Sequence, residues 1–305
     1  MTATLIDGKG YAAGLNELSA KAAQRLKDDH DIIPGLAVIN VGDDPASKVY
    51  TRNKVETAQK IGIHAELHQL PPSTTQDELL DLLDRLNKSD TIHSILVQLP
   101  LPPHIEEKTI IDAVTPEKDI DGFHTTNVGR LVSGLPGHVP CTPVGCMLLL
   151  RHFVGDLTGK DVIIIGRSHI VGRPLSNLLV NANATVTIAH SRTRNLAEQC
   201  RNKDIVIAAV GLPEFIQDDW IKPGAVVLDV GINRVFIEEE GGKSRLVGDV
   251  CFEEVSEVAG FITPVPGGIG PMTVACLVRG TVLTAYRMAG LEEPRLELDR
   301  GSLPD

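Results

Sequence analysis

The segment 162–174 reads Val162-Ile163-Ile164-Ile165-Gly166-Arg167-Ser168-His169-Ile170-Val171-Gly172-Arg173-Pro174 and decides the fold. The apolar run before Gly166 predicts a strand that is buried on both faces. Pro174 suits the first turn of a helix, so strand, turn and helix are expected in that order. Backbone N–H groups in such a turn face a pyrophosphate, which predicts a dinucleotide site containing Gly166, Arg167 and Ser168.

This turn departs from the usual dinucleotide fingerprint, because Ser168 replaces the middle glycine of G-x-G-x-x-G. A purely structural strand–turn–helix is the alternative. The dinucleotide interpretation is favoured by further buried strands, expected at 185–189, 204–210, 225–230 and 260–263. Their order predicts a doubly wound, Rossmann-like domain.

The end of the next strand indicates which dinucleotide binds. NAD enzymes place an acidic residue about 20 residues past the glycines, where it binds the ribose hydroxyl. Here the strand is followed by His190-Ser191-Arg192-Thr193, which contains no acid. Hydroxyl and guanidinium groups suit a 2′-phosphate, so we expect NADP, with Ser191 and Arg192 among its ligands. A solvated basic turn is the alternative.

A second glycine-rich loop reads Pro264-Val265-Pro266-Gly267-Gly268-Ile269-Gly270-Pro271-Met272-Thr273. Its glycines permit close backbone approach to a ligand, whereas a tight structural turn would need fewer of them. Pro271 suits the first turn of the apolar helix expected over 271–288.

The N-terminal half alternates helix and strand patterns. Helices are expected at 11–29 and 46–61, and a third runs from the capping box Thr75-x-x-Glu78 to Asn87. Strands are expected at 35–41, 63–70 and 92–99. This order implies parallel strands with crossover helices. The expected domains are an N-terminal α/β domain over 1–142 and the Rossmann-like domain over 143–274, with 275–305 packing back on the first. Residues after Glu292 are expected to fray.

The composition excludes several classes of protein. The 305 residues carry a formal net charge of -11, which argues against nucleic acid because phosphate neutralisation needs clustered Lys and Arg. The 5 cysteines are scattered without a CxxC pair, so no disulfide framework and no metal is expected. There is no N-terminal signal pattern and no apolar run near about 18 residues, so we expect no membrane segment and a cytoplasmic protein.

The N-terminal half also holds candidate catalytic residues. Tyr50 and Lys54 are spaced i,i+4 and share a helix face, although most such pairs are solvated surface. Gln98 ends an apolar strand, and ligands bind at the carboxyl ends of parallel strands. Asp119 and Asp121 lie beside Gly122, where a capped loop is the simpler account.

These segments together resemble the bifunctional methylenetetrahydrofolate dehydrogenase/cyclohydrolase (FolD) family. The resembling pieces are Val41–Ser47 with Tyr50 and Lys54, Val97–Pro102, Lys118–Phe123, Gly166–Ser168 and Pro266–Thr273. They occur in the family's order along nearly the whole chain. Ile269, Cys251 and Ser89 depart from the family's usual residues, and none of them is a presumed catalytic position.

The resemblance implies a homodimer of two-domain α/β chains, each with an N-terminal catalytic domain, a C-terminal NADP-binding domain and a cleft between them. Such an enzyme oxidises 5,10-methylenetetrahydrofolate with NADP and hydrolyses the methenyl product to 10-formyltetrahydrofolate. Tyr50 would stack on the folate, Lys54 would be catalytic, Gln98 would position Lys54, and Asp121 would bind the pterin. Further contacts are implied for the folate at Leu99, Pro266, Gly267 and Gly268, and for NADP at Gly166, Arg167, Ser168, Ser191 and Ile232.

Two other functions compete with this one. A monofunctional, NAD-linked dehydrogenase is disfavoured by the presence of Lys54 and by the basic turn at Arg192. A catalytically idle binding module would be expected to lose Lys54 or Asp121. Hydrolysis needs a group that exchanges protons near neutral pH, and burial can bring the pKa of a lysine down to roughly 7–8. We therefore expect Lys54 to serve the hydrolysis.

Overall fold

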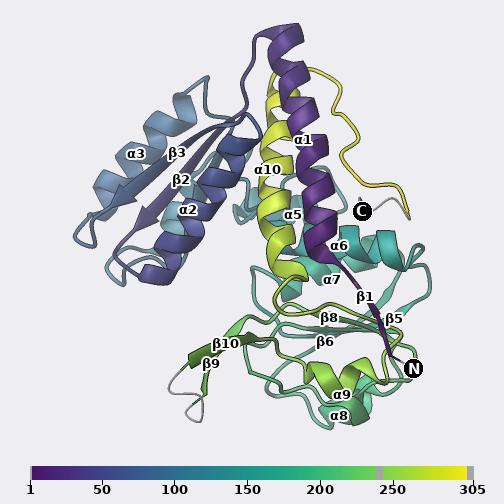
Figure 1. Ribbon diagram of the computed structural model, residues 1–305. Coiled ribbons are helices and arrows are strands. Elements are labelled where there is room, and N and C mark those ends of the chain that lie inside the picture. The colour runs from purple at the N-terminus through teal and green to yellow at the C-terminus, as the bar shows by residue number, and fades with distance from the viewer. Residues whose placement is uncertain (1, 238–242, 301–305) are drawn as a thin grey trace. The chain divides into compact units, whose positions relative to one another are not determined.

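The computed structural model describes residues 2–237 and 243–300, which divide into two compact units (Figure 1). Unit 1 contains the residues up to Ala12, Thr142–Thr273 and the described residues from Leu298 on. Unit 2 contains Ala13–Cys141 and Val274–Glu297. Helices α1 (Gly8–His30) and α10 (Ile269–Met288) each begin in unit 1 and continue into unit 2.

Unit 1 is built on a 6-stranded parallel sheet with the order β1-β11-β8-β7-β5-β6. Its strands are β1 (Thr4–Leu5), β5 (Asp161–Ile165), β6 (Thr185–Ala189), β7 (Ile205–Ala208), β8 (Val226–Asp229) and β11 (Phe261–Ile262). Strands β7 and β8 are buried throughout, as is β5 beyond Asp161, which explains their continuous apolar runs. The chain crosses from one side of β5 to the other between β6 and β7, and this is where doubly wound sheets bind their ligands.

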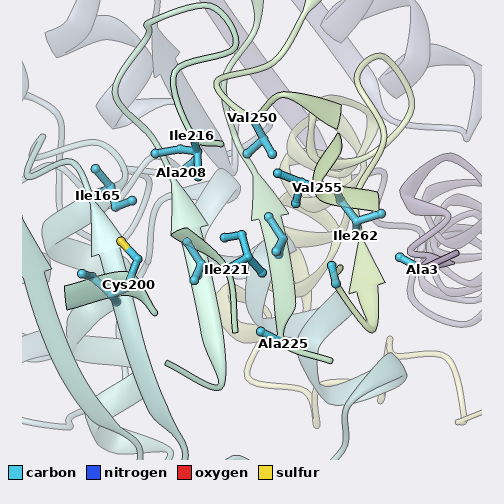
Figure 2. Close-up of a cluster of buried hydrophobic side chains, with 14 of the residues drawn as sticks. Ala3, Ile165, Cys200, Ala208, Ile216, Ile221, Ala225, Val250, Val255 and Ile262 are labelled. Atoms are coloured by element: carbon cyan, nitrogen blue, oxygen red, sulfur yellow. The ribbon is translucent and has the colours of Figure 1, made fainter. Parts of the chain in front are cut away.

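The core of unit 1 also explains where the first residues of the chain belong. Figure 2 shows Ala3 in the same buried cluster as Ile262 and Ile165. Strand β1 pairs in parallel with β11, and the Ala3 N–H donates to the carbonyl of Ser256. Compact unit 2 therefore begins at Ala13, later than the expected domain 1–142, because β1 adds an edge strand to the sheet of unit 1. The domain limits stay a prediction.

Shorter elements complete unit 1. Its helices are α6 (Cys141–Phe153), α7 (Gly172–Asn181), α8 (Leu196–Cys200), the 3-10 turn η1 (Asp218–Trp220) and α9 (Phe252–Ser256). An antiparallel pair, β9 (Asn233–Ile237) and β10 (Lys243–Val247), was not expected from the sequence. Its strands mix charged and apolar residues, so they lack the uniform apolar run that identified the buried strands.

Unit 2 holds a 3-stranded parallel sheet with the order β3-β2-β4. Its strands are β2 (Gly35–Val41), β3 (His64–Leu70) and β4 (Ser94–Val97), and its helices are α2 (Pro45–Lys60), α3 (Gln76–Lys88), α4 (Glu107–Ala113) and α5 (Thr125–Val132). One face of β2 packs on α3, where Ala37 and Ile39 join a cluster with Leu79 and Leu83. Helix α2 covers the other side of the sheet (Figure 1).

Local sequence signals fix where these helices begin. The Thr75 hydroxyl accepts the Glu78 N–H while the Glu78 carboxylate accepts the Thr75 N–H, so the expected capping box is present. At α2 the Asp44 carboxylate accepts the Ser47 N–H, and Pro45 occupies the first turn. The Asp44 carboxylate thus caps the N-terminus of the helix that carries Tyr50 and Lys54.

The C-terminal segment is ordered farther than expected. Leu296 is only 2% exposed, and the Arg279 guanidinium donates to its carbonyl at 2.7 Å. The expectation of fraying after Glu292 is therefore wrong as far as Leu296, because this apolar side chain is buried in unit 2; residues 301–305 lie outside the described part. Among the described helices, α10 alone is long and apolar enough to cross a membrane. Of its most apolar 18-residue window, 67% is buried inside the protein, as in a core helix.

Candidate active site

Lys54 is a buried lysine held by two neighbours in unit 2. Its side chain lies on the third turn of α2, and the residue is only 6% exposed. The ammonium Nζ donates to Gln98 Oε1 at 3.0 Å and lies 4.6 Å from the centroid of the Tyr50 ring, a cation–π distance. The alternative of a solvated surface pair is therefore wrong for Lys54. The structure brings Tyr50, Lys54 and Gln98 together.

Gln98 is itself fixed, so its oxygen faces Lys54. It follows β4, and its backbone N–H donates to the carbonyl of Ile39 in the neighbouring strand. Its side-chain Nε2 donates to the carbonyl of Leu99 at 2.8 Å, which leaves Oε1 to accept from the ammonium. The polar side chain at the end of a buried strand is thus explained by its partner on α2.

Asp121 and Lys54 influence each other's protonation. Burial lowers the pKa of Lys54, and the negative charge of Asp121 opposes that shift in part. Desolvation of its carboxyl group raises the pKa of Asp121 to about 6, against the opposing effect of Lys54, although the residue as a whole is only half-buried. Lys54 therefore loses its proton at a lower pH than a lysine in water, and Asp121 loses its proton at a higher pH than an aspartate in water.

The residues next to Asp121 have structural tasks. The Lys118 ammonium donates to the carbonyls of Leu86, Asn87 and Ser89 at the end of α3, at 3.2, 2.8 and 2.6 Å. The Asp119 carboxylate accepts the backbone N–H of His124 and the side-chain amide of Asn127, each at 2.9 Å. The capped-loop account thus holds for Asp119, while Asp121 is the acid of this segment whose charge acts on Lys54.

The glycine turn after β5 has the backbone of a phosphate-binding loop. Gly166 has a φ of +130°, and a Cβ there would overlap the carbonyl oxygen of Ala209 in the loop after β7. The Ser168 hydroxyl accepts the N–H of Val171 at 3.1 Å and that of Gly172 at 3.5 Å, where α7 begins. The residue that replaces the usual middle glycine therefore caps the turn.

The basic turn after β6 is closed by hydrogen bonds of its own. The His190 N–H donates to the Thr193 hydroxyl at 2.9 Å, and the Thr193 N–H donates back to the His190 carbonyl at 2.8 Å. The Arg192 N–H donates to Nδ1 of the His190 ring at 3.1 Å. Ser191 and Arg192 are exposed on this turn. His190 and Thr193 were not singled out from the sequence, because their role is to shape the turn.

The second glycine loop lines a cavity of about 120 Å³ together with residues 229–232. Pro266, Gly267, Gly268 and Ile232 are among its lining residues, and Ile232 is 58% exposed. All of these residues belong to unit 1. The expected site residues thus form two groups, one around Lys54 in unit 2 and one along the carboxyl edge of the sheet in unit 1.

These features define a class of protein. Unit 1 is a doubly wound domain with a glycine turn suited to a dinucleotide, and unit 2 carries a buried lysine that can exchange a proton. The chain has the fold and the glycine turn of a dinucleotide-dependent enzyme, and its second unit carries the buried Lys54 group.

Comparison with known proteins identifies the family. Residues 6–121 match the catalytic domain of tetrahydrofolate dehydrogenase/cyclohydrolase, and residues 140–289 match its NAD(P)-binding domain. The bifunctional protein FolD 1 of Roseobacter denitrificans is 55% identical over 96% of this chain and 98% of its own. The crystal structure of bifunctional FolD from Campylobacter jejuni superposes with a TM-score of 0.89 at 47% identity, over 93% of this chain and 99% of that one. The Trypanosoma brucei FolD structure, complexed with NADP and an inhibitor, has a TM-score of 0.89 at 39% identity. That match covers 95% of this chain and 99% of that one.

The chain belongs to the tetrahydrofolate dehydrogenase/cyclohydrolase family. The predicted family, the two-domain α/β fold and the bifunctional dehydrogenase and cyclohydrolase are confirmed. The roles of the individual site residues rest on the geometry above and are proposals.

Proposed function

We propose that Lys54 performs the hydrolysis of 5,10-methenyltetrahydrofolate, positioned by Gln98 and Tyr50, while Asp121 binds the pterin. The observation that carries this proposal is the buried Nζ of Lys54, 3.0 Å from Gln98 Oε1, with its pKa lowered by burial. A lysine in water would be protonated at neutral pH and could not accept a proton.

The oxidation makes modest demands on the protein. The methylene carbon of the substrate lies between two nitrogens, whose lone pairs stabilise the cation that remains after oxidation. NADP, when bound, accepts the hydride. The task of the chain is therefore to position the substrate, which we assign to Tyr50, Leu99 and Asp121 in unit 2.

Hydrolysis requires movement of protons. Water forms a C–O bond to the methenyl carbon, and the neutral Lys54 amine takes the proton that the water loses. The bond between that carbon and N5 then breaks as N5 receives a proton from the Lys54 ammonium. The hydroxyl on the carbon loses its proton to solvent as the C=O bond forms, which leaves the formyl group on N10 and releases one proton overall. The Gln98 oxygen stabilises the ammonium between these two steps.

NADP is the cofactor, and unit 1 contains groups suited to it. The Gly166 turn offers backbone N–H groups for the pyrophosphate, and Arg167 and Ser168 belong to the same turn. Ile232 lines the cavity at the second glycine loop. We assign the 2′-phosphate to the exposed turn carrying Ser191 and Arg192, where no acidic side chain follows β6. The family resemblance also supports a homodimer in the cytoplasm, with neither nucleic acid nor membrane as a partner.

The test of this function is the variant Lys54→Met, which keeps the length of the side chain and removes its nitrogen. We expect the cyclohydrolase rate to fall by roughly 10²–10⁴-fold, the contribution of a general acid–base group. Lys60→Met, on the exposed face of the same helix, is the matched control and should retain both activities. Full cyclohydrolase activity in Lys54→Met would refute the assignment.

A further inference from the structure

Two buried carboxylates in unit 1 have no role assigned above, although one of them, Asp229, lines the cavity at the second glycine loop. Asp229 ends β8 and is 3% exposed, and Asp249 precedes α9 and is 0% exposed. Burying anions is costly unless every oxygen is satisfied by a donor. The hydrogen bonds that they accept therefore show which parts of the backbone the two carboxylates hold in place.

Asp249 joins two loops at the carboxyl edge of the sheet. Its Oδ2 accepts the N–H of Val210 at 2.6 Å and that of Gly211 at 3.0 Å, both in the loop after β7. Its Oδ1 accepts the side-chain amide of Asn233 at 2.9 Å, in the segment after β8. One carboxylate thus fixes the spacing between these two loops.

The Asp229 carboxylate fixes the backbone at Asp249 by accepting hydrogen bonds from it and from its neighbours. Its Oδ1 accepts the N–H of Gly231 at 3.0 Å and that of Asp249 at 2.9 Å, and its Oδ2 accepts the N–H of Val250 at 2.9 Å. The fit is tight, because a Cβ at Gly248 would overlap the Asp229 carboxylate. Burial raises the pKa of Asp229 to about 7 even with these three donors, so the arrangement is costly in free energy.

One of the loops held in this way carries Ile232, which is assigned to the cofactor, and the other adjoins the glycine turn. Ile232 lies between Gly231 and Asn233, whose contacts to the two carboxylates define its place beside the cavity at Pro266–Gly268. The loop after β7 also adjoins the phosphate turn, because the Ala209 carbonyl faces Gly166. Apolar side chains could fill this interior at lower cost, but they could not align backbone N–H groups from separate loops.

We propose that Asp249 and Asp229 are positioning residues of the NADP site, which set the backbone of residues 210–211 and the place of Ile232 for the nicotinamide half of the cofactor. This inference rests on the proposed placement of NADP in unit 1. The carboxylates act through the loops and do not touch the reacting atoms.

The test is Asp249→Asn, which keeps the shape and replaces one acceptor oxygen by an N–H₂ donor. Because that donor faces groups that are donors themselves, we expect the Kd and KM for NADP to rise by about tenfold or more. The cyclohydrolase rate with methenyltetrahydrofolate, measured without NADP, should stay within about twofold because Lys54 is in the other unit. This split separates loss of positioning from loss of folding.

The matched control is Asp204→Asn, the same substitution at a residue just before β7, whereas Asp249 contacts the loop after β7. Asp204 accepts the Asp161 N–H at 3.0 Å and pairs with Lys222 at the amino edge of the sheet. Its NADP affinity should equal that of the wild type. An Asp249→Asn protein that binds NADP like Asp204→Asn, or that loses both activities in parallel, would overturn the inference.

Asn233→Ala provides a milder second variant if Asp249→Asn does not fold. It removes one donor and leaves both carboxylates, so NADP should bind more weakly, in the same direction and to a smaller extent. Unchanged NADP affinity would also overturn the inference. A wild-type protein without NADP-dependent dehydrogenase turnover would instead overturn the proposed function on which the inference rests.

Discussion

Lys54 and Asp121 show how burial changes what a common side chain can do. A Tyr–Lys pair spaced i,i+4 could be placed on one helix face from the sequence, but its burial could not, because that depends on the strand that supplies Gln98. The same holds for Asp229 and Asp249, which in the sequence are polar residues at the ends of apolar runs. The donors that satisfy them come from several loops that only the tertiary fold brings together.

Asp121→Asn tests the coupling between the two groups. The carboxylate favours the charged ammonium and therefore raises the pKa of Lys54, so its removal should lower that pKa further while burial stays. If neutral Lys54 is the active form, the acidic limb of the cyclohydrolase pH–rate profile will move to lower pH, whatever the maximal rate becomes. Asp84→Asn, an exposed acid on α3, should leave the limb in place. A limb that stays or moves to higher pH in Asp121→Asn would contradict the coupling.

Arg192→Ala tests the choice of cofactor. A guanidinium that reads the 2′-phosphate contributes to NADP and not to NAD, so the KM for NADP should rise about tenfold or more while that for NAD changes little. Arg201→Ala is the control, since Arg201 lies on the same unit and pairs with Asp219. Equal effects on NADP and NAD would mean that another residue reads the phosphate.

Among the elements, those with a strong local signal were predicted best. The bounds of β2, β5 and β6 match the expected apolar runs, and the capping box places the start of α3. The two-residue strand β1 could not be predicted, because it exists through its pairing with β11, more than 200 residues away along the chain. The pair β9–β10 was missed for a different reason, because its strands mix charged and apolar residues without a clear alternation.

Lys118→Met tests a tertiary cap on α3. The buried ammonium satisfies three carbonyls at the end of the helix, so its loss should lower the free energy of unfolding by roughly 2 kcal/mol. Lys88→Met is the control in the same helix turn, where an exposed pair with Asp84 is worth about 0.5 kcal/mol or less. Urea denaturation compares the two, and equal losses would show that the contacts of Lys118 do not cap the helix.

At the scale of the whole molecule, the family was identified from the motifs of the chain, while the structure assigns a separate group of site residues to each unit. The dinucleotide loops belong to unit 1 and the Lys54 group belongs to unit 2. Variants in one unit should therefore affect one activity more than the other, as Asp249→Asn and Lys54→Met are designed to reveal.

The most direct test of the central claim is steady-state turnover of 5,10-methylenetetrahydrofolate with NADP and, separately, with NAD, following reduced cofactor and the methenyl intermediate together. We predict that NADPH forms faster than NADH and that little methenyl compound accumulates, because the hydrolysis proposed for the Lys54 site removes it in the same protein. Accumulation of the methenyl compound at the rate of NADPH formation would contradict the role of Lys54. Absence of any reduced cofactor would contradict the dehydrogenase itself.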